Sequence, residues 1–289
     1  MPTNAPETMG VIYRLQLSQL HPHPQNPFSI RDDQAMLDLI QSVQSHGVLV
    51  PAIARPRPDG EYEIIAGHRR KHASELAGLD FMPVVVLDLN DDEAIIQLVD
   101  SNIQREIILP SERAKAYKMR MEAMKRQGAR TDLTSPNISA KFRSDDELGQ
   151  EVGVSGDTIR NYASLTNLVP ELMQMVDEGR IKLSPAYQIA ALPHNEQSLL
   201  LDTIESEQAT PSLSQAQRMK RLSQNGELNE DVLLEIMMEQ KKPVRNDITL
   251  SGEKLRKYFP KSYSPIQMEN VIFKLLEAWQ RKRQRDQSR

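Results

Sequence analysis

The hydrophobic pattern of the first hundred residues switches repeatedly between strand spacing and helix spacing. Apolar alternation predicts four strands, at 11–17, 52–55, 62–65 and 82–87. Apolar residues at helical spacing predict three helices, beginning at Asp32 or Asp33, at His68 and at Asp91 or Asp92. The first of these helices is expected to end at Gly47, and three prolines in 21–27 predict an extended loop. This mixture predicts an α+β unit.

Strand patterns stop near residue 110, and helical spacing continues to the end of the chain. A helix is expected from Pro110 to Gly128, followed by a polar loop at 129–143. Prolines 193 and 211 separate further short helices, and Asn225-Gly226 suggests a boundary. Beyond it, helices are expected at 231–238 and 268–279, with a strand or cap at 247–250.

These patterns predict four parts. They are a disordered tail at 1–10, an α/β domain at 11–110, an all-α helix-turn-helix domain at 111–225, and a mainly helical C-terminal region at 226–289.

The helix-turn-helix prediction depends on residues 144–165. Ser144 or Asp145 caps a first helix with Leu148 buried, Gly153 makes the turn, and Val154 is expected to pack inward. Ser155 caps a second helix, whose outward positions are Gly156, Asp157, Thr158, Arg160, Asn161 and Ser164. In the major groove, Arg can read guanine and Asn can read adenine. An unrelated all-α helix pair is the alternative.

Composition narrows the class of protein. The chain of 289 residues has no cysteine, which excludes disulfides, thiolate metal sites and cysteine nucleophiles. No apolar run approaches membrane-spanning length, and the N-terminus lacks a signal-peptide pattern, so we expect a cytoplasmic protein without a membrane partner.

Charge is unevenly distributed along a chain whose formal net charge is −4. Residues 111–143 carry nine Lys or Arg against three acids, and residues 274–289 carry six against two. Basic patches on an acidic chain are typical of proteins that meet phosphate backbones with selected faces. The helix from Glu112 to Arg126, with Lys118, Lys125 and Arg126, is therefore expected to contact DNA phosphates, although a solvated helix face is an equal alternative.

The C-terminal region ends in a helix with an apolar stripe ahead of a basic run. The stripe consists of Ile266, Val271, Leu275, Leu276 and Trp279. A partner helix or self-association is one interpretation, and simple packing on the rest of the chain is the other.

Residues 61–78 have the pattern of a strand, a glycine turn and a helix. Gly67 interrupts the strand immediately before a helical run that begins His68-Arg69-Arg70. Backbone N–H groups at a helix start, together with guanidinium groups, can hold phosphate. A short surface pair of arginines is the alternative.

Several of these motifs resemble those of the ParB partition family. GHRR at 67–70 resembles its GERR phosphate motif, and SNIQRE with LPSERAKAY at 101–117 resembles its ENxQR segment and the sequence that follows. With the helix-turn-helix, the resemblance covers about residues 11–225 and suggests a divergent plasmid or mobile-element member. It implies a ParB/sulfiredoxin-like N-terminal domain and a CTP-dependent clamp that closes over double-stranded DNA. A homodimer and a ParA-type ATPase partner are implied as well.

The resemblance also assigns site residues. Gly67, His68, Arg69 and Arg70 would hold the triphosphate of CTP, Asn102 would bind Mg²⁺, and Gln104 and Arg105 complete that motif. Ser155, Gly156, Thr158, Arg160 and Asn161 would contact DNA, with Lys118, Lys125 and Arg126 on its phosphates.

The motifs also depart from the family. His68 replaces a Glu, Val50 stands where the family has a Gln near the base, and Ser101 replaces the Glu linked to metal and hydrolysis. Asp100 could substitute only if the helix end rewinds, because adjacent residues lie about 100° apart. No catalytic residue is therefore assigned, and at most a weak CTPase is expected. Two alternatives stay open: a repressor that is independent of nucleotide, and a slow nucleotide hydrolase or nuclease.

Overall fold

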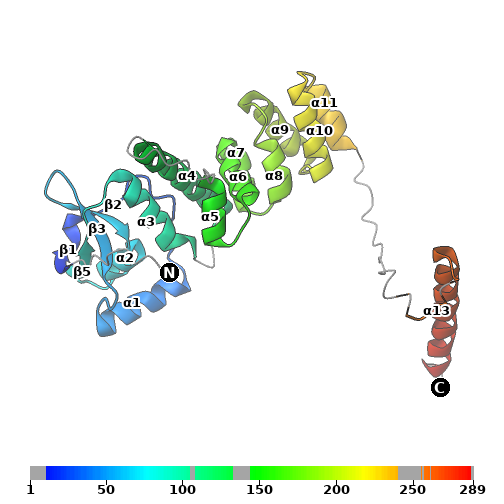
Figure 1. Ribbon diagram of the computed structural model, residues 1–289, viewed down its shortest axis with the longest axis horizontal. Helices are drawn as coiled ribbons and strands as arrows, with labels where there is room; N and C mark the ends of the chain where they lie inside the picture. Colours follow the sequence, from blue (N-terminus) through cyan, green and yellow to red (C-terminus); the bar gives the residue numbers. More distant parts are fainter. Residues whose placement is uncertain are drawn as a thin grey trace. The chain divides into compact units, whose positions relative to one another are not determined.

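The computed structural model describes residues 11–104, 108–132, 144–239, 255, 257–260 and 262–287. The chain forms two compact units, Met1–Glu239 and Gln240–Arg289 (Figure 1). The order of elements agrees with the predicted fold class: a mixed α/β region is followed by helices alone.

A five-stranded mixed sheet forms the N-terminal region. Its strands are β1 Ile12–Gln16, β2 Leu20–Pro22, β3 Ala52–Pro56, β4 Tyr62–Ala66 and β5 Phe81–Val86. Their order is β1-β5-β3-β4-β2, with antiparallel β1–β5 and β3–β4 pairs and parallel β5–β3 and β4–β2 pairs. The four predicted strands are confirmed, but β2 lies where a loop was expected. It has only three residues and pairs with β4, which is distant in sequence, so no local sequence pattern indicates it.

Three helices belong to this sheet: α1 Gln34–His46, α2 His68–Leu76 and α3 Asp91–Ile103. Asp33 caps α1 by accepting from the Met36 N–H at 2.9 Å, and α1 ends at Gly47 with φ of 70°, as the sequence predicted. Asn90 and Glu93 form a capping box at the start of α3.

Strand β4 is buried on both faces of the sheet, as its neighbouring residues show. Ile64 is fully buried in a cluster with Ala54, Met82 and Val84, whereas Ile65 packs into a second cluster with Leu98 of α3. Because successive strand residues point to opposite faces, α3 is held against one face of β4 by Ile65. That contact fixes the position of Asn102 in the last turn of α3.

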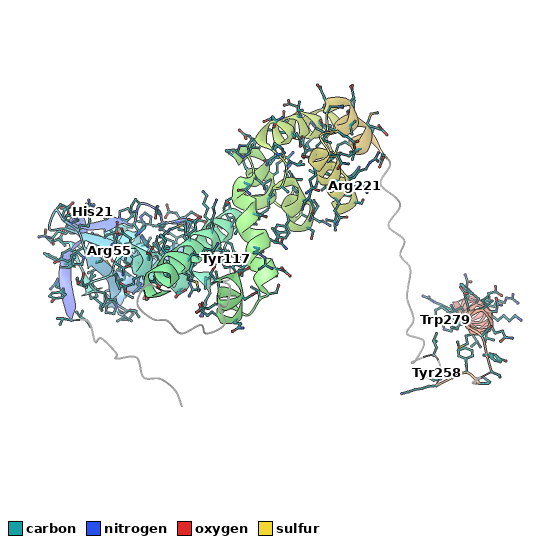
Figure 2. All side chains as sticks on the ribbon, turned by 45° about the horizontal axis from the view of Figure 1, so that its top comes forward. His21, Arg55, Tyr117, Arg221, Tyr258 and Trp279 are labelled. Carbon is teal, nitrogen blue, oxygen red and sulfur yellow. The ribbon has the colours of Figure 1, made fainter. Side chains whose placement is uncertain are left out.

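Helix α4, Pro110–Asp132, connects the α/β region to the remaining helices (Figure 1). Three consecutive apolar positions on it enter three different cores. Ala114 joins the large core of the helices that follow, and Ala116 joins the core of α3 and β4. Tyr117, labelled in Figure 2, joins the helix-turn-helix core. The helix was expected to end at Gly128, which was wrong, since a glycine inside a helix costs only about 1 kcal/mol and the helix continues to Asp132. The rest of the predicted loop lies outside the described residues.

The remaining helices of the first unit pack into two hydrophobic cores, the first two helices into the core that contains Tyr117 and the other five into a larger one. They are α5 Ser144–Val152, α6 Gly156–Ser164, α7 Pro170–Asp177, α8 Leu183–Ile189, α9 His194–Glu207, α10 Leu213–Gln224 and α11 Glu230–Met238. Pro193 directly precedes α9, as expected. Core contacts continue beyond Gly226 to Leu233 and Ile236, which pack with Leu200. The predicted domain boundaries stay a prediction.

The second unit contains α13, Pro265–Gln287, which includes the predicted helix at 268–279. Phe273, Leu275, Leu276 and Trp279 are all more than half exposed on it. Trp279 also lies beside Arg283, whose guanidinium carbon is 5.5 Å from the ring centre (Figure 2). The segments 1–10 and 247–250 lie outside the described residues. Among the helices that the structure describes, none combines the length and apolar character needed to cross a bilayer.

Candidate functional site

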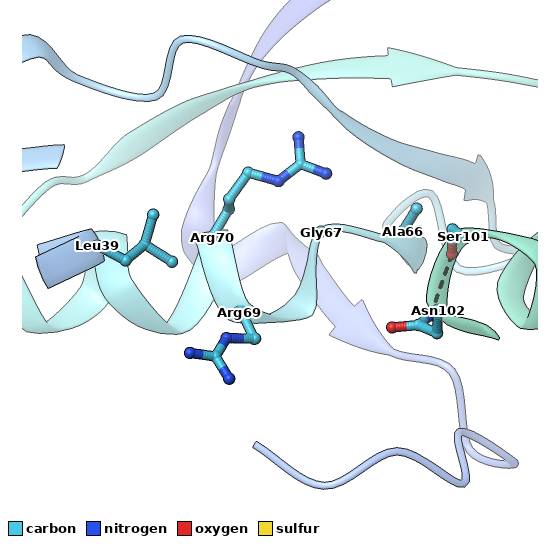
Figure 3. Close-up of a pocket in the computed structure, with 7 residues that line it drawn as sticks. All are labelled: Leu39, Ala66, Gly67, Arg69, Arg70, Ser101 and Asn102. Atoms are coloured by element: carbon cyan, nitrogen blue, oxygen red, sulfur yellow. Dashed lines mark hydrogen bonds between the residues drawn. The ribbon is translucent and has the colours of Figure 1, made fainter. Parts of the chain in front are cut away.

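Two sequence motifs about thirty residues apart meet at one cavity of about 260 Å³ (Figure 3). Gly67, Arg69 and Arg70 line it from the turn between β4 and α2, and Ser101 and Asn102 line it from the end of α3. Leu39 of α1 and Ala66 of β4 complete the lining. The start of one helix and the end of another therefore face a common space.

Gly67 is required at this turn for two reasons. Its φ of 108° lies in the left-handed region that side chains disfavour. A Cβ atom at this position would also lie 2.8 Å from the Cβ of Ala52. The first N–H groups of a helix have no partner within it, and the start of α2 lines the cavity through Gly67 and Arg69, so these groups can serve an anion there.

The two arginines of the turn are held differently. Arg70 donates from Nη1 to the backbone oxygens of Val50 and Pro51, at 2.5 and 2.6 Å, and burial lowers its pKa from the usual value. Arg69 donates from Nη2 to Asp33 Oδ1 at 3.2 Å. Arg70 is thereby fixed to the segment that contains Val50, the position that the family resemblance places near the nucleotide base.

Asn102 is buried, and its orientation is determined by hydrogen bonds. Its Nδ2 donates to the Leu98 backbone oxygen at 2.7 Å and to Ser101 Oγ at 3.0 Å. Because a backbone carbonyl only accepts, the nitrogen must face Leu98 and the oxygen is left for the cavity. Figure 3 shows this oxygen on the side of Asn102 that faces Arg69. An amide oxygen is a hard ligand of the kind that Mg²⁺ accepts, and this cation usually takes only one or two ligands from a protein.

Ser101 and Asp100 are adjacent in the sequence, but their side chains have different surroundings. Ser101 lines the cavity and donates to the Leu98 oxygen at 2.9 Å, so its hydroxyl is engaged with its own helix. Asp100 faces α4 instead, where its Oδ1 lies 2.8 Å from Arg120 Nε. Asp100 therefore does not replace the missing family carboxylate, because α3 stays helical through Ile103.

Two other residues predicted for this site, His68 and Gln104, are not among those that line the cavity. His68 is buried at the first position of α2, and Gln104 is exposed at the end of α3. Arg105 lies outside the described residues. Their assigned roles stay predictions.

The helix-turn-helix is packed through glycines. Gly156 was expected to face outward, which was wrong: it is buried, and a Cβ there would lie 2.0 Å from Asp146 Oδ1. Val154 was expected to pack inward and is instead 39% exposed. Its backbone occupies that space, because the Val154 N–H donates to the Gly149 oxygen at 2.8 Å and its own oxygen lies against Gly149. Backbone approach, rather than a side chain, joins α5 to α6.

Helix α6 and its cap carry the residues that were predicted to contact DNA bases. Ser155 caps the helix by accepting from the Thr158 N–H at 3.2 Å, and Asn161 is exposed. Arg160 forms ion pairs with Asp145 of α5 and with Asp157 one turn earlier. The guanidinium predicted to read a base is thus paired with two carboxylates of its own chain.

An aromatic cluster fixes α6 relative to α4 and α8. The ring of Tyr162 makes edge contacts with Tyr117 of α4 and Tyr187 of α8, at centroid distances of 5.7 and 5.9 Å. Arg113 of α4 lies over the Tyr162 ring at 5.4 Å, and burial raises the pKa of Tyr187. Aromatic packing on two neighbouring helices therefore holds α6 in place.

Acidic residues of neighbouring helices pair with part of the positive charge of α4. Arg126 Nε lies 2.6 Å from Asp92 of α3, and Arg120 pairs with Asp100 and with Glu151 of α5. Lys118 is exposed and donates to Thr166 Oγ1 at 3.2 Å, and Lys125 is exposed. A net charge counted along the sequence could not reveal which cations pair with acids on other helices.

Sequence reasoning missed Leu39, Ala66 and Asp33 near the cavity. Leu39 is one of several apolar residues of α1, so its position gave no signal of a site. Asp33 was identified as a helix cap, but its bond to Arg69 spans 36 positions and no local pattern indicates it.

The fold and the cavity define a class of protein: an α/β domain with a glycine turn whose two arginines line a cavity, joined to a helix-turn-helix domain. Two family models match the chain. The ParB N-terminal domain matches residues 2–103, and the ParB HTH domain matches residues 137–211. The chain belongs to the ParB family.

Among curated relatives, the chromosome-partitioning protein Spo0J of Thermus thermophilus is 32% identical over 187 residues, which are 65% of this chain and 62% of that protein. The matched part therefore spans less than two thirds of this relative.

Two solved structures of C-terminally truncated ParB from Caulobacter crescentus are also similar. The complex with the centromeric parS site is 25% identical and covers 74% of this chain and 99% of that one, with a TM-score of 0.45. The complex with CTP-γ-S is 29% identical and covers 63% and 93%, with a TM-score of 0.32.

Proposed function

We propose that the chain is a site-specific DNA-binding partition protein that binds CTP with Mg²⁺ and closes as a dimeric clamp over a centromere-like site. The observation that carries the nucleotide part is the convergence of Arg69, Arg70 and Asn102 on one cavity. Two guanidinium groups and the helix start supply positive potential for a triphosphate, and the fixed oxygen of Asn102 supplies a hard ligand for the metal.

The DNA-binding part is supported by the matched HTH model and by the exposed face of α6. Arg160 and Asn161 would contact bases in the major groove, and Lys118 and Lys125 would contact phosphates. Partition as the biological role comes from the relatives, since Spo0J of Thermus thermophilus is a chromosome-partitioning protein. A ParA-type ATPase partner belongs to the same proposal.

Hydrolysis would be slow at most. The hydroxyl of Ser101 stands at the cavity where the family motif has a carboxylate, and this hydroxyl is bonded to its own helix. It provides neither a negative metal ligand nor a general base. Binding, rather than turnover, would therefore set the state of the clamp.

Calorimetry of the full chain with CTP, ATP, GTP and UTP, each with and without Mg²⁺, tests the nucleotide part. We expect CTP binding that requires Mg²⁺ and that falls about tenfold or more in Arg69→Met, since a charged phosphate contact is lost. Lys71→Met is the matched control, because Lys71 lies on the same helix and pairs with Glu75. Binding of no nucleotide would refute this part.

The absent carboxylate favours a second candidate, a transcriptional repressor that is indifferent to nucleotide. Sequencing the DNA that co-purifies with the protein, with and without CTP, separates the two. Spreading of the recovered DNA away from one site in CTP supports the clamp. Recovery of the same short site in both conditions supports the repressor.

A further inference from the structure

One carboxylate oxygen near the cavity serves two partners at once. Asp33 Oδ1 accepts from the Met36 N–H at 2.9 Å, which caps α1, and from Arg69 Nη2 at 3.2 Å. Both bonds lower the pKa of Asp33, the backbone bond most, so the group is ionised at neutral pH. The cap of one helix is thus also the counter-ion of an arginine that lines the cavity.

A second acid–base contact lies beside the first. Asp32 Oδ1 is 2.9 Å from His72 Nε2, and His72 is three positions after Arg69 on α2. Residues three apart lie on one face of a helix, so Asp32 and Asp33 meet the same face of α2. This geometry holds the start of α1 against α2, the helix that begins directly after Gly67.

A phosphate oxygen and Asp33 would compete for the same guanidinium group. Both are anionic acceptors that suit its planar fork, and an arginine paired fully with one offers less to the other. The Asp33 side chain is 48% exposed and that of Arg69 is 27% exposed. An ion pair at such a partly exposed position is weak, so a polyphosphate with several negative charges can displace it.

We propose that Asp33 is a built-in competitor for the nucleotide: it occupies Arg69 in the empty site and yields this arginine to the phosphate chain when a nucleoside triphosphate binds. The inference rests on the proposed function and adds a residue that sets its affinity. Asp33 is a positioning residue, since it acts through Arg69. Displacement leaves the Met36 bond in place, so α1 keeps its cap while it loses a link to α2.

Asp33→Asn separates these two tasks. Asparagine is as good a helix cap as aspartate, so the Met36 bond and the fold are retained, while the negative charge that holds Arg69 is removed. We expect the variant to bind Mg²⁺–CTP about two- to fivefold more tightly than the wild type, which is the usual range for a partly exposed pair. Inorganic triphosphate should show the same direction, because the competition concerns phosphate and not the base.

The matched control is Asp38→Asn, which removes the same charge from the same helix. Asp38 accepts from Gln34 Nε2 at 3.0 Å, more than a turn beyond the cap. Its affinity for CTP should stay close to the wild-type value. In an Arg69→Met background, Asp33→Asn should have no effect, because the group for which the two anions compete is gone. Thermal unfolding of each variant verifies that the cap is retained.

The outcomes are distinct. Tighter binding by Asp33→Asn that vanishes in the Arg69→Met background supports the inference. Unchanged or weaker binding by Asp33→Asn, or an equal gain in Asp38→Asn, overturns it while the wild type still binds CTP and the proposed function stands. No binding by any variant overturns the proposed function itself.

Discussion

Arg120 of α4 is buried with its Nε 2.8 Å from Asp100 Oδ1 of α3, and it also pairs with Glu151 of α5. This one guanidinium group therefore joins the helix that ends at the cavity to the first helix of the helix-turn-helix. Asp100 and Asn102 are two residues apart, so α3 directs one toward α4 and the other toward the cavity.

Removal of this guanidinium should destabilise the first unit. Arg120→Met keeps most of the buried aliphatic volume but leaves two carboxylates without their shared cation. We expect the free energy of unfolding to fall by about 1–3 kcal/mol, less than for a fully buried pair because both acids are about half exposed. Urea unfolding followed by circular dichroism measures this change.

The control for this prediction is Lys115→Met. Lys115 is exposed on the same helix, so its loss should change the unfolding free energy by less than about 0.5 kcal/mol. An equal effect of both substitutions would show that the ion pairs of Arg120 contribute nothing beyond helix charge.

Gly67→Ala should impair both folding and the cavity. The added Cβ would meet the Cβ of Ala52 at 2.8 Å in a backbone with φ of 108°, so strain and a clash coincide. We expect a loss of about 2–4 kcal/mol in unfolding free energy, together with loss of nucleotide binding. Gly60→Ala is the matched control, since Gly60 has φ of 85° but open space around it. If the two variants lose the same stability, the close approach to Ala52 is unimportant.

Local signals explain which features could be predicted from the sequence. Asp33 and Gly47 delimit α1, and Gly67 separates β4 from α2, because caps and glycine turns act within a few residues. The motif at 67–70 and Asn102 were assigned to one site by family resemblance alone. Their convergence depends on Ile65 packing against Leu98, a contact that spacing along the chain does not encode.

Features that depend on contacts between distant elements could not be predicted. Val154 was expected to pack inward, but the close backbone approach at Gly149, which no side-chain pattern indicates, leaves it exposed. Strand β2 forms only because β4 offers it a parallel edge. The count of basic residues on α4 included Arg120 and Arg126 as charges available to DNA. In the structure, acids of α3 and α5 pair with Arg120, and an acid of α3 pairs with Arg126.

A buried histidine should make stability depend on pH. His23 is 5% exposed, accepts at Nδ1 from the Gln25 N–H at 3.2 Å, and has Nε2 3.9 Å from Glu63. Burial lowers its pKa below 6.5, against the opposite effect of Glu63, whose carboxylate is shared with Arg55. The unfolded chain then binds the proton more readily, so this stabilisation is present above about pH 6.5 and is lost as pH falls through the folded-state pKa.

The measurement compares unfolding free energies at pH 7.5 and 5.5 in buffers of equal ionic strength. We expect the wild type to lose stability at the lower pH, and His23→Gln to lose less. His46→Gln, at an exposed position on α1, shows whether removal of any imidazole has this effect. A wild-type stability that rises on acidification would contradict the direction derived from burial.

The carboxylates around Arg160 should limit DNA affinity. Asp157 pairs with Arg160 from an 80% exposed position, whereas Asp145 pairs with it from a buried one, so Asp157 is the partner that can be removed without damage to the core. Asp157→Asn leaves the guanidinium more available and removes a negative charge beside the DNA backbone. We expect binding to the cognate site to tighten about two- to fivefold in fluorescence anisotropy at fixed salt. Glu147→Gln, an exposed acid on α5, is the charge control and should have a smaller effect.

Arg160→Ala should instead cost about 1–3 kcal/mol of discrimination between cognate and altered sites, because a base contact is lost. If Arg160→Ala weakens binding to every sequence equally, Arg160 contacts phosphate and the base-reading role falls to Asn161.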